Sequence, residues 1–284
     1  MTKSETSRRS LGVAAGLAGL VLLIGPSAAS AASITFASHR AIYDLKLAET
    51  RGKRAVESVR GRILYDFSGN ACDGYSLQFR QVSELDSGEG KVALSDLRAV
   101  TWEDAAAKNF RFNSQNFLDE RQVDSVDGSA ERLNDKVAVT LSKPKQKSFD
   151  LPVNMVFPTE HMRRIIEAAI EGKTILDFPV YDGSESGEKV YNTLTVIGHE
   201  IPPGDKKPTD AAAGKPELEH LRRWPVTISY FDSASKAGEQ TPVYAISFEL
   251  YENGISRALS LDYGDFVVAG EMTELDMKQA KPCQ

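Results

Sequence analysis

The sequence predicts an all-β protein with a mainly antiparallel sheet and one main amphipathic helix. Two observations support this prediction. Most of the chain alternates apolar and polar residues with a period of two, and only one long segment has the spacing of an amphipathic helix. About a dozen strands in one antiparallel sheet leave edges that need protection, so we expect the sheet to close or to twist and curve strongly.

The predicted strands follow one another along most of the chain. The alternating segments are residues 43–47, 75–79, 92–94, 110–112, 137–141, 194–196, 226–230, 243–251, 255–263 and 266–268. Asn253-Gly254 separates two of the C-terminal segments. Both residues accept the positive φ angles of a type I′ turn, so this pair predicts a tight hairpin.

The one clear helix is predicted at residues 159–171. Five apolar residues recur at helical spacing and form one stripe: Met162, Ile165, Ile166, Ala169 and Ile170. Thr159 is expected to cap the helix start, and Gly172 suits its end. Such a helix can cover one opening of a curved sheet.

Residues 1–31 have the pattern of an export signal. Lys3, Arg8 and Arg9 precede an uncharged apolar run at 11–25, and small residues follow at 29–31. The apolar run is shorter than the roughly 20 residues of a membrane-spanning helix. We therefore expect cleavage near Ala31, which leaves residues 32–284 as a single exported β-rich domain with no transmembrane span.

A flexible loop is predicted at residues 202–218. This segment is rich in Pro, Gly, Lys and Ala and contains almost no large apolar residue. It therefore offers little surface for burial against the ordering entropy of the chain.

The two cysteines, Cys72 and Cys283, are most simply a disulfide. An exported compartment is oxidising, and an even number of cysteines there favours pairing. The bond would hold the extreme C-terminus, which otherwise frays, against an early part of the fold.

Composition and motifs exclude several classes of function. The 284 residues include 34 Lys and Arg against 40 Asp and Glu, so no basic excess favours nucleic acid. The four histidines show no metal-ligand spacing, and no nucleotide-binding motif indicates a cofactor. Residues 183–187 resemble a nucleophile elbow but carry Glu185 at the nucleophile position. We therefore expect no catalytic residue, metal or cofactor.

Core packing is the default explanation for aromatic residues at alternating strand positions. A curved sheet with a helix over one end can also enclose an apolar cavity. The residues expected near such a cavity are Tyr43, Tyr75, Phe79, Trp102, Phe110 and Phe112, with His161 on the helix.

Several segments, in order, carry a resemblance to a known family. They are residues 39–45, 72–75, 101–104, 157–161 and 248–254, followed by Pro282-Cys283. Together they resemble EipB, the envelope integrity protein B family of alphaproteobacteria. The resemblance implies a periplasmic protein with a long antiparallel sheet that curls into a spiral, and a disulfide between Cys72 and Cys283. It also implies a role in cell-envelope homeostasis and envelope stress, and a link to a periplasmic tetratricopeptide-repeat protein. It supplies no catalytic residue.

Three hypotheses of function follow, in order of preference. The first is a non-enzymatic envelope-integrity factor that binds another envelope component, with a partner surface on exposed sheet or loop, for example around the helix at 159–171. The second is a carrier or chaperone of a lipophilic envelope molecule, such as a lipid, in a cavity of the curved sheet. The third is a hydrolase that uses His161 with a nearby carboxylate.

Overall fold

The structure is a computed structural model that describes residues 34–51, 56–88, 90, 92–234, 241–279 and 283. The expected export signal and its cleavage site near Ala31 lie outside the described residues. Within the described part, fourteen strands form a single sheet. Every pairing between neighbouring strands is antiparallel, so the predicted fold class is confirmed.

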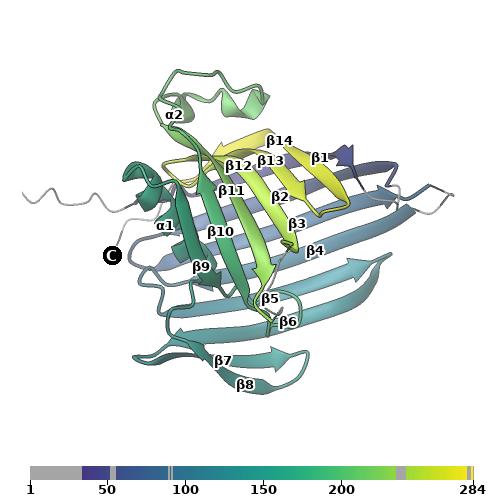
Figure 1. The fold of residues 1–284 in the computed structure, drawn as a ribbon, viewed down its shortest axis with the longest axis vertical. Coiled ribbons are helices and arrows are strands. Elements are labelled where there is room, and N and C mark those ends of the chain that lie inside the picture. Colours follow the sequence, from purple (N-terminus) through teal and green to yellow (C-terminus); the bar gives the residue numbers. More distant parts are fainter. Residues whose placement is uncertain are drawn as a thin grey trace, which may run out of the picture. The chain divides into compact units, whose positions relative to one another are not determined.

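The strands run in nearly continuous succession (Figure 1). In the N-terminal half they are β1 (His39–Thr50), β2 (Ser58–Asn70), β3 (Gly74–Asp86), β4 (Val92–Glu103), β5 (Asn109–Leu118), β6 (Arg121–Arg132), β7 (Lys136–Lys143) and β8 (Lys147–Pro152). In the C-terminal half they are β9 (Ile175–Val180), β10 (Tyr191–Ile197), β11 (Arg223–Asp232), β12 (Tyr244–Tyr251), β13 (Ser256–Asp262) and β14 (Phe266–Met277). The spatial order runs from β8 down to β1, then from β14 down to β9, so β1 and β14 join the two halves.

The sheet curls so that its two halves share a core. Phe67 of β2 and Tyr75 of β3 pack in one cluster with Val226 of β11 and Leu250 of β12. Ile165 of the main helix fills the same cluster. The curvature expected for so long a sheet is therefore present, and it brings strands that are far apart in the sheet order into contact.

The sheet does not close into a barrel, because β8 and β9 end the strand order without pairing along their length. A single residue in the segment that follows β8, Val156, forms an isolated bridge to β9. The N–H of Val156 donates to the Pro179 carbonyl at 2.8 Å, and the N–H of Tyr181 donates to the Val156 carbonyl at 3.0 Å. This single contact pins the two edges together next to the main helix.

The main helix, α1, spans Pro158–Ile170 and confirms the predicted helix, with a different start. Its N-cap is Phe157, and the expected cap by Thr159 is wrong. Thr159 lies inside the first turn because Pro158, which lacks an N–H, opens the helix. The free N–H groups of Thr159 and Glu160 instead donate to the carboxylate of Glu103 at 2.7 and 2.8 Å.

The predicted tight hairpin needs correction, and the burial pattern of β10 runs against hydropathy. The hairpin between β12 and β13 exists, but its connection is residues 252–255 rather than a two-residue turn. Only Gly254 has a positive φ, +87°, while the Asn253 side chain accepts the Ile255 N–H at 3.2 Å. In β10, Leu194 and Val196 are exposed, whereas Thr193 and Thr195 are buried. The Thr193 hydroxyl donates to the Phe178 carbonyl at 3.0 Å.

The segment at 202–218 connects β10 to β11 and carries local structure. It forms a short 3₁₀ helix, η1 (Ala211–Ala213), and one turn of helix, α2 (Pro216–Glu219). Its Asp210 and Leu218 are buried. The Asp210 carboxylate pairs with the buried guanidinium of Arg257 on β13, which also pairs with Glu249. A buried charge pair and the burial of Leu218 in the core therefore hold this segment.

Candidate functional site

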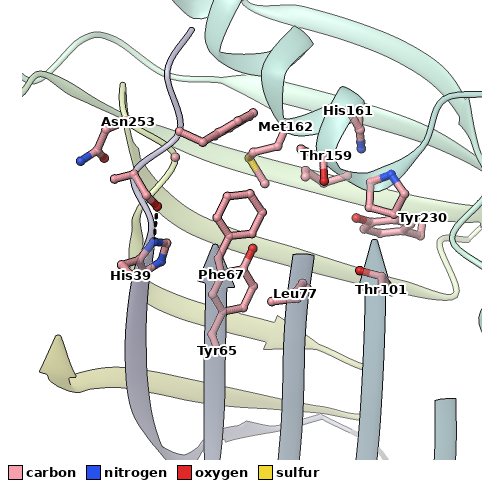
Figure 2. A pocket seen from close by; sticks show the side chains of 15 residues that line it. His39, Tyr65, Phe67, Leu77, Thr101, Thr159, His161, Met162, Tyr230 and Asn253 are labelled. Atoms are coloured by element: carbon pink, nitrogen blue, oxygen red, sulfur yellow. Dashed lines mark hydrogen bonds between the residues drawn. The ribbon is translucent and has the colours of Figure 1, made fainter. Parts of the chain in front are cut away.

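A cavity of about 160 Å³ lies beneath the first turn of α1 and is called the α1 pocket here. Five parts of the fold build it: the start of α1, the N-terminal segment with β1, the ends of β2, β3 and β4, the middle of β11, and the β12–β13 turn. Figure 2 shows their side chains converging below the helix. The pocket therefore exists only because the curled sheet brings β2–β4 opposite β11.

The walls of the pocket are mainly apolar and aromatic. The apolar residues are Phe36, Ala37, Phe67, Leu77, Pro158, Met162, Ile228 and Gly254. Phe36 packs edge-on against Phe67, with ring centroids 5.8 Å apart, and Tyr65 stacks on His39 at 5.6 Å. These ring contacts fix the shape of the lower wall.

The polar groups that line the pocket are all uncharged types or histidine. They are His39, Tyr65, Thr101, Thr159, His161, Tyr230 and Asn253. Among the described residues that line this cavity, none is Asp, Glu, Lys or Arg. The pocket thus combines an apolar wall with neutral hydrogen-bonding groups, which is the usual make-up of a small ligand site.

Both pocket histidines are held in the neutral form. Burial lowers the pKa of His39, and burial together with the nearby charge of Arg164 lowers the pKa of His161 to about 4. The Nδ1 of His39 lies 2.8 Å from the Ala37 carbonyl, which fixes the proton on that nitrogen. Burial also raises the pKa of Tyr65 to about 12 and raises that of Tyr230, so both phenols keep their protons.

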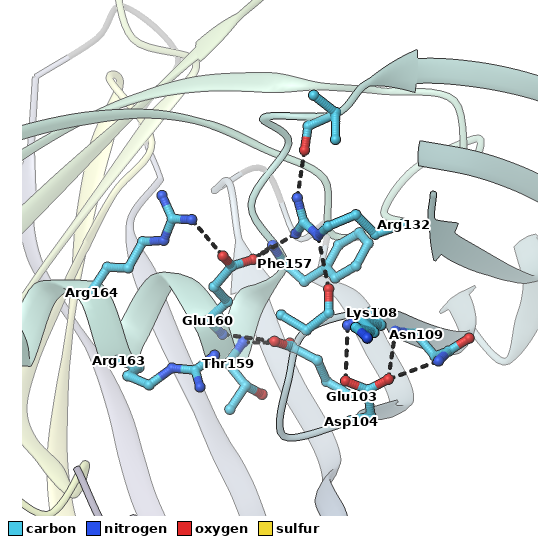
Figure 3. Close-up of polar contacts among 12 residues, drawn as sticks. Glu103, Asp104, Lys108, Asn109, Arg132, Phe157, Thr159, Glu160, Arg163 and Arg164 are labelled. Carbon is cyan, nitrogen blue, oxygen red and sulfur yellow. Dashed lines mark hydrogen bonds and ion pairs between the residues drawn. The ribbon is translucent and has the colours of Figure 1, made fainter. Parts of the chain in front are cut away.

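The helix above the pocket is held by a network of acidic and basic side chains, drawn in Figure 3. Glu160 pairs with Arg132 of β6 at 2.7 Å and with Arg164 at 2.6 Å. Arg163 donates to the Ala105 carbonyl at 2.9 Å. Together with the Glu103 cap, these contacts fix the first turn of α1, and with it the four side chains that α1 places over the pocket.

Glu103 is a buried acidic residue, and burial disfavours its ionised form. Its side chain is buried, and burial raises its pKa to about 7 even though two backbone N–H groups donate to it. The neighbouring carboxylate of Glu160 adds to this rise. The carboxyl group that accepts the first N–H groups of α1 therefore changes its protonation near neutral pH.

The predicted pocket residues are dispersed rather than gathered. Among them, only His161 lines the α1 pocket. Tyr43 is buried in a core cluster that includes residues of β1, β2, β13 and β14. Its hydroxyl donates to the Ser256 carbonyl at 2.7 Å. The Tyr75 ring stacks on Phe67, with ring centroids 5.4 Å apart, and does not itself line the pocket. Phe79 packs against the same core cluster as Tyr43.

The remaining aromatic candidates lie on β4 and β5. Phe110 and Phe112 belong to a core cluster with Phe157 and Tyr181. Trp102 lies on the outer face of β4, where the Arg111 guanidinium covers its ring at 5.2 Å. The pocket residues that were missed include Tyr65, Phe67 and Tyr230. Residues 59–67 alternate clearly, so the strand pattern was available to place Tyr65 and Phe67 on one inner face.

His161 lacks the partner that the hydrolase hypothesis needs. Its Nε2 lies 3.5 Å from the Thr193 hydroxyl, and its ring meets Phe178 edge-on at 5.9 Å. Within the described chain, no carboxylate hydrogen-bonds this ring, because Glu103 and Glu160 are engaged by backbone N–H groups and arginines. No observation here favours hydrolysis.

Three further findings bear on function. Cys72 and Cys283 are joined by a disulfide that closes a separation of 211 residues. In the described ranges, no cluster of three His, Cys, Asp or Glu side chains is placed to hold a metal ion. Over the same ranges, the helices are too short or too polar to cross a membrane.

Comparison with known proteins identifies similar chains. The family model described as EipB-like matches residues 30–279. The chain is 38% identical over 253 residues to a protein named cell envelope integrity protein EipB from Brucella abortus (strain 2308), which covers 88% of each chain. It is also similar to a crystal structure described as a beta-barrel-like protein of a domain of unknown function from Brucella abortus. That match has a TM-score of 0.81 and 36% identity, and covers 87% of this chain and 100% of the other.

Proposed function

The chain belongs to the EipB-like family, and on this premise we propose that it is an exported periplasmic factor that maintains cell-envelope integrity by binding another envelope component, without catalysis. The observation that carries the proposal is the 38% identity, across 88% of both chains, to a protein named for cell envelope integrity. The expected export signal at residues 1–31 supports the compartment, and so does the disulfide, which suits an oxidising space.

An exposed apolar patch supports binding to a protein partner. Ile175 on the edge strand β9 is 65% exposed, and it pairs in register with Val196, which is 47% exposed. Leu194, two residues before Val196 on the same face of β10, is 40% exposed. Apolar side chains grouped at an unpaired strand are typical of a protein interaction surface. A periplasmic tetratricopeptide-repeat protein is the partner that we propose for it.

Complementation of a deletion strain tests this proposal. Val196→Asp places a charge in the patch, and we expect it to fail to restore resistance to a membrane-active detergent. Val92→Asp is the matched control, because Val92 is also an exposed strand valine, at 57%, and lies on β4. The proposal is rejected if the deletion leaves detergent resistance unchanged, or if both variants restore it fully at equal protein levels.

The α1 pocket favours a second candidate, a carrier of a lipophilic envelope molecule. The apolar wall supports it, but a volume of about 160 Å³ limits the bound part to a small group. Native mass spectrometry of protein purified from the periplasm separates the two candidates. A carrier retains a bound small molecule, whereas a partner-binding factor does not require one.

A further inference from the structure

The size of the α1 pocket restricts what it can hold. Its volume is about 160 Å³, and an engineered apolar protein cavity of about 150 Å³ accommodates one benzene molecule. An occupant of this size is one six-membered ring or a similarly short chain. A complete acyl chain of a membrane lipid exceeds this space.

The lining restricts the charge of the occupant. The described residues around the pocket contribute no carboxylate, ammonium or guanidinium group, and both histidines are neutral because they are buried. A charged occupant would therefore lose its hydration without gaining a counter-ion, which is strongly unfavourable. The pocket selects for an uncharged group.

The lining also offers hydrogen bonds that the fold does not use. The hydroxyl groups of Tyr65 and Tyr230 make no hydrogen bond to any residue that the structure describes. The Nδ1 of His39 is engaged by the Ala37 carbonyl, so its Nε2 is left as an acceptor. Figure 2 shows the Tyr65, Thr101 and Tyr230 side chains directed toward one space beneath Met162. An occupant with one hydroxyl or amide group can pair with these groups.

The aromatic walls favour a ring over a short aliphatic chain. Phe67, Tyr65 and Tyr230 each present a ring to the pocket. Aromatic rings gain additional energy from edge-on or offset contacts with one another. Shape, charge and polarity therefore converge on one kind of group.

We propose that the α1 pocket binds a single uncharged ring that carries a hydroxyl or amide group, such as a phenol. The ring comes either from a small envelope molecule or from a tyrosine side chain of a partner protein. This inference deepens the proposed binding role. It is tested on the purified protein, so its failure is distinct from the absence of an envelope defect.

The test compares near-isosteric probes that differ in charge. Benzamide and p-cresol are neutral at about pH 7.5, whereas benzoate and benzylamine are charged. We expect the neutral probes to bind and to perturb the nuclear magnetic resonance signals of the His39 and His161 rings. We expect each charged probe to bind at least about tenfold more weakly, because its charge would be buried without a partner. N-acetyl-tyrosinamide distinguishes the sources: if it binds as p-cresol does, a partner side chain can enter, and if p-cresol alone binds, a small molecule is the source.

A filled pocket provides the structural control. Leu77→Trp enlarges a side chain that lines the pocket and should abolish binding of p-cresol. Leu194→Trp makes the same change at an exposed position on β10 and should leave binding intact. The proposal is overturned if benzoate binds as tightly as benzamide, if no neutral probe binds at millimolar concentration, or if Leu77→Trp binds p-cresol normally. The probe comparison on the unaltered protein decides the question even if Leu77→Trp does not fold.

Discussion

Replacing Glu103 with Gln should change how the stability of the protein depends on pH. The folded pKa of Glu103 is about 7, against an ordinary value of 4.5, so near pH 6 the folded state holds a proton that the unfolded state releases. A pKa raised on folding adds stability that is complete below the unfolded pKa and is lost as pH rises through the folded pKa. A shift of this size corresponds to about 3 kcal/mol between about pH 4 and pH 8.

In Glu103→Gln this contribution is absent at every pH. We therefore expect the free energy of unfolding of the variant, relative to the native protein, to rise by about 3 kcal/mol from about pH 4 to pH 8. The assay is urea denaturation with the disulfide intact, followed by tryptophan fluorescence at several pH values. Because other titrating groups are common to both proteins, their effects cancel in the difference.

The control is Glu84→Gln, which removes an exposed carboxylate on β3. The two N–H donors at the start of α1 provide the opposing force in this reasoning, because they favour the ionised carboxylate. If the stability difference between Glu103→Gln and the native protein is constant with pH, these donors balance the effect of burial on the pKa of Glu103. If the difference falls as pH rises, the donors outweigh burial. The reasoning would then be refuted.

Three further substitutions have expected effects on urea stability. Asp210→Asn removes one of the two carboxylates that pair with the buried Arg257, and Glu249 remains, so it should cost up to about 3–5 kcal/mol. Glu271→Gln, in an exposed ion pair, should cost less than about 1 kcal/mol. Equal losses would contradict this. Gly254→Ala should destabilise the protein more than Gly264→Ala. Both glycines have positive φ, but of the two only Gly254 would place a Cβ against the Phe36 ring, at 2.4 Å. Similar losses of stability would contradict this, because they would show that the Phe36 ring moves away freely. Cys72→Ser should cost up to about 5 kcal/mol by the loop-entropy model, and an unchanged midpoint would contradict it.

The sheet was predictable because its signal is local. Alternation of apolar and polar residues appears within each strand, and the helix stripe appears within two or three turns. β10 shows the limit of this signal. Thr193 and Thr195 face the core, while Leu194 and Val196 face outward, so hydropathy alone assigns the wrong face. The apolar residues Val196 and Ile175 lie side by side on the exposed face, and β9, which carries Ile175, is an edge strand. The sequence of β10 alone contains neither fact.

The site was not predictable because it depends on distant residues. Tyr65, His161 and Tyr230 come from β2, α1 and β11, and only the curl of the sheet brings them together. Sequence alone also gave no means of choosing which aromatic residues face a cavity and which fill the core. For the same reason, Asp210 was placed in a flexible loop, since its partner Arg257 lies 47 residues away.

The most direct test of the central claim is photo-crosslinking in the periplasm from the edge-strand patch. A photoreactive residue at Ile175, in a protein that still restores envelope integrity, should capture one specific envelope component. The same residue at the exposed position Val92 should not capture it. Capture of that component from Ile175 alone is the result that binding through this patch predicts. Full restoration of envelope integrity with no specific product from Ile175, or with the same product from both positions, would contradict it.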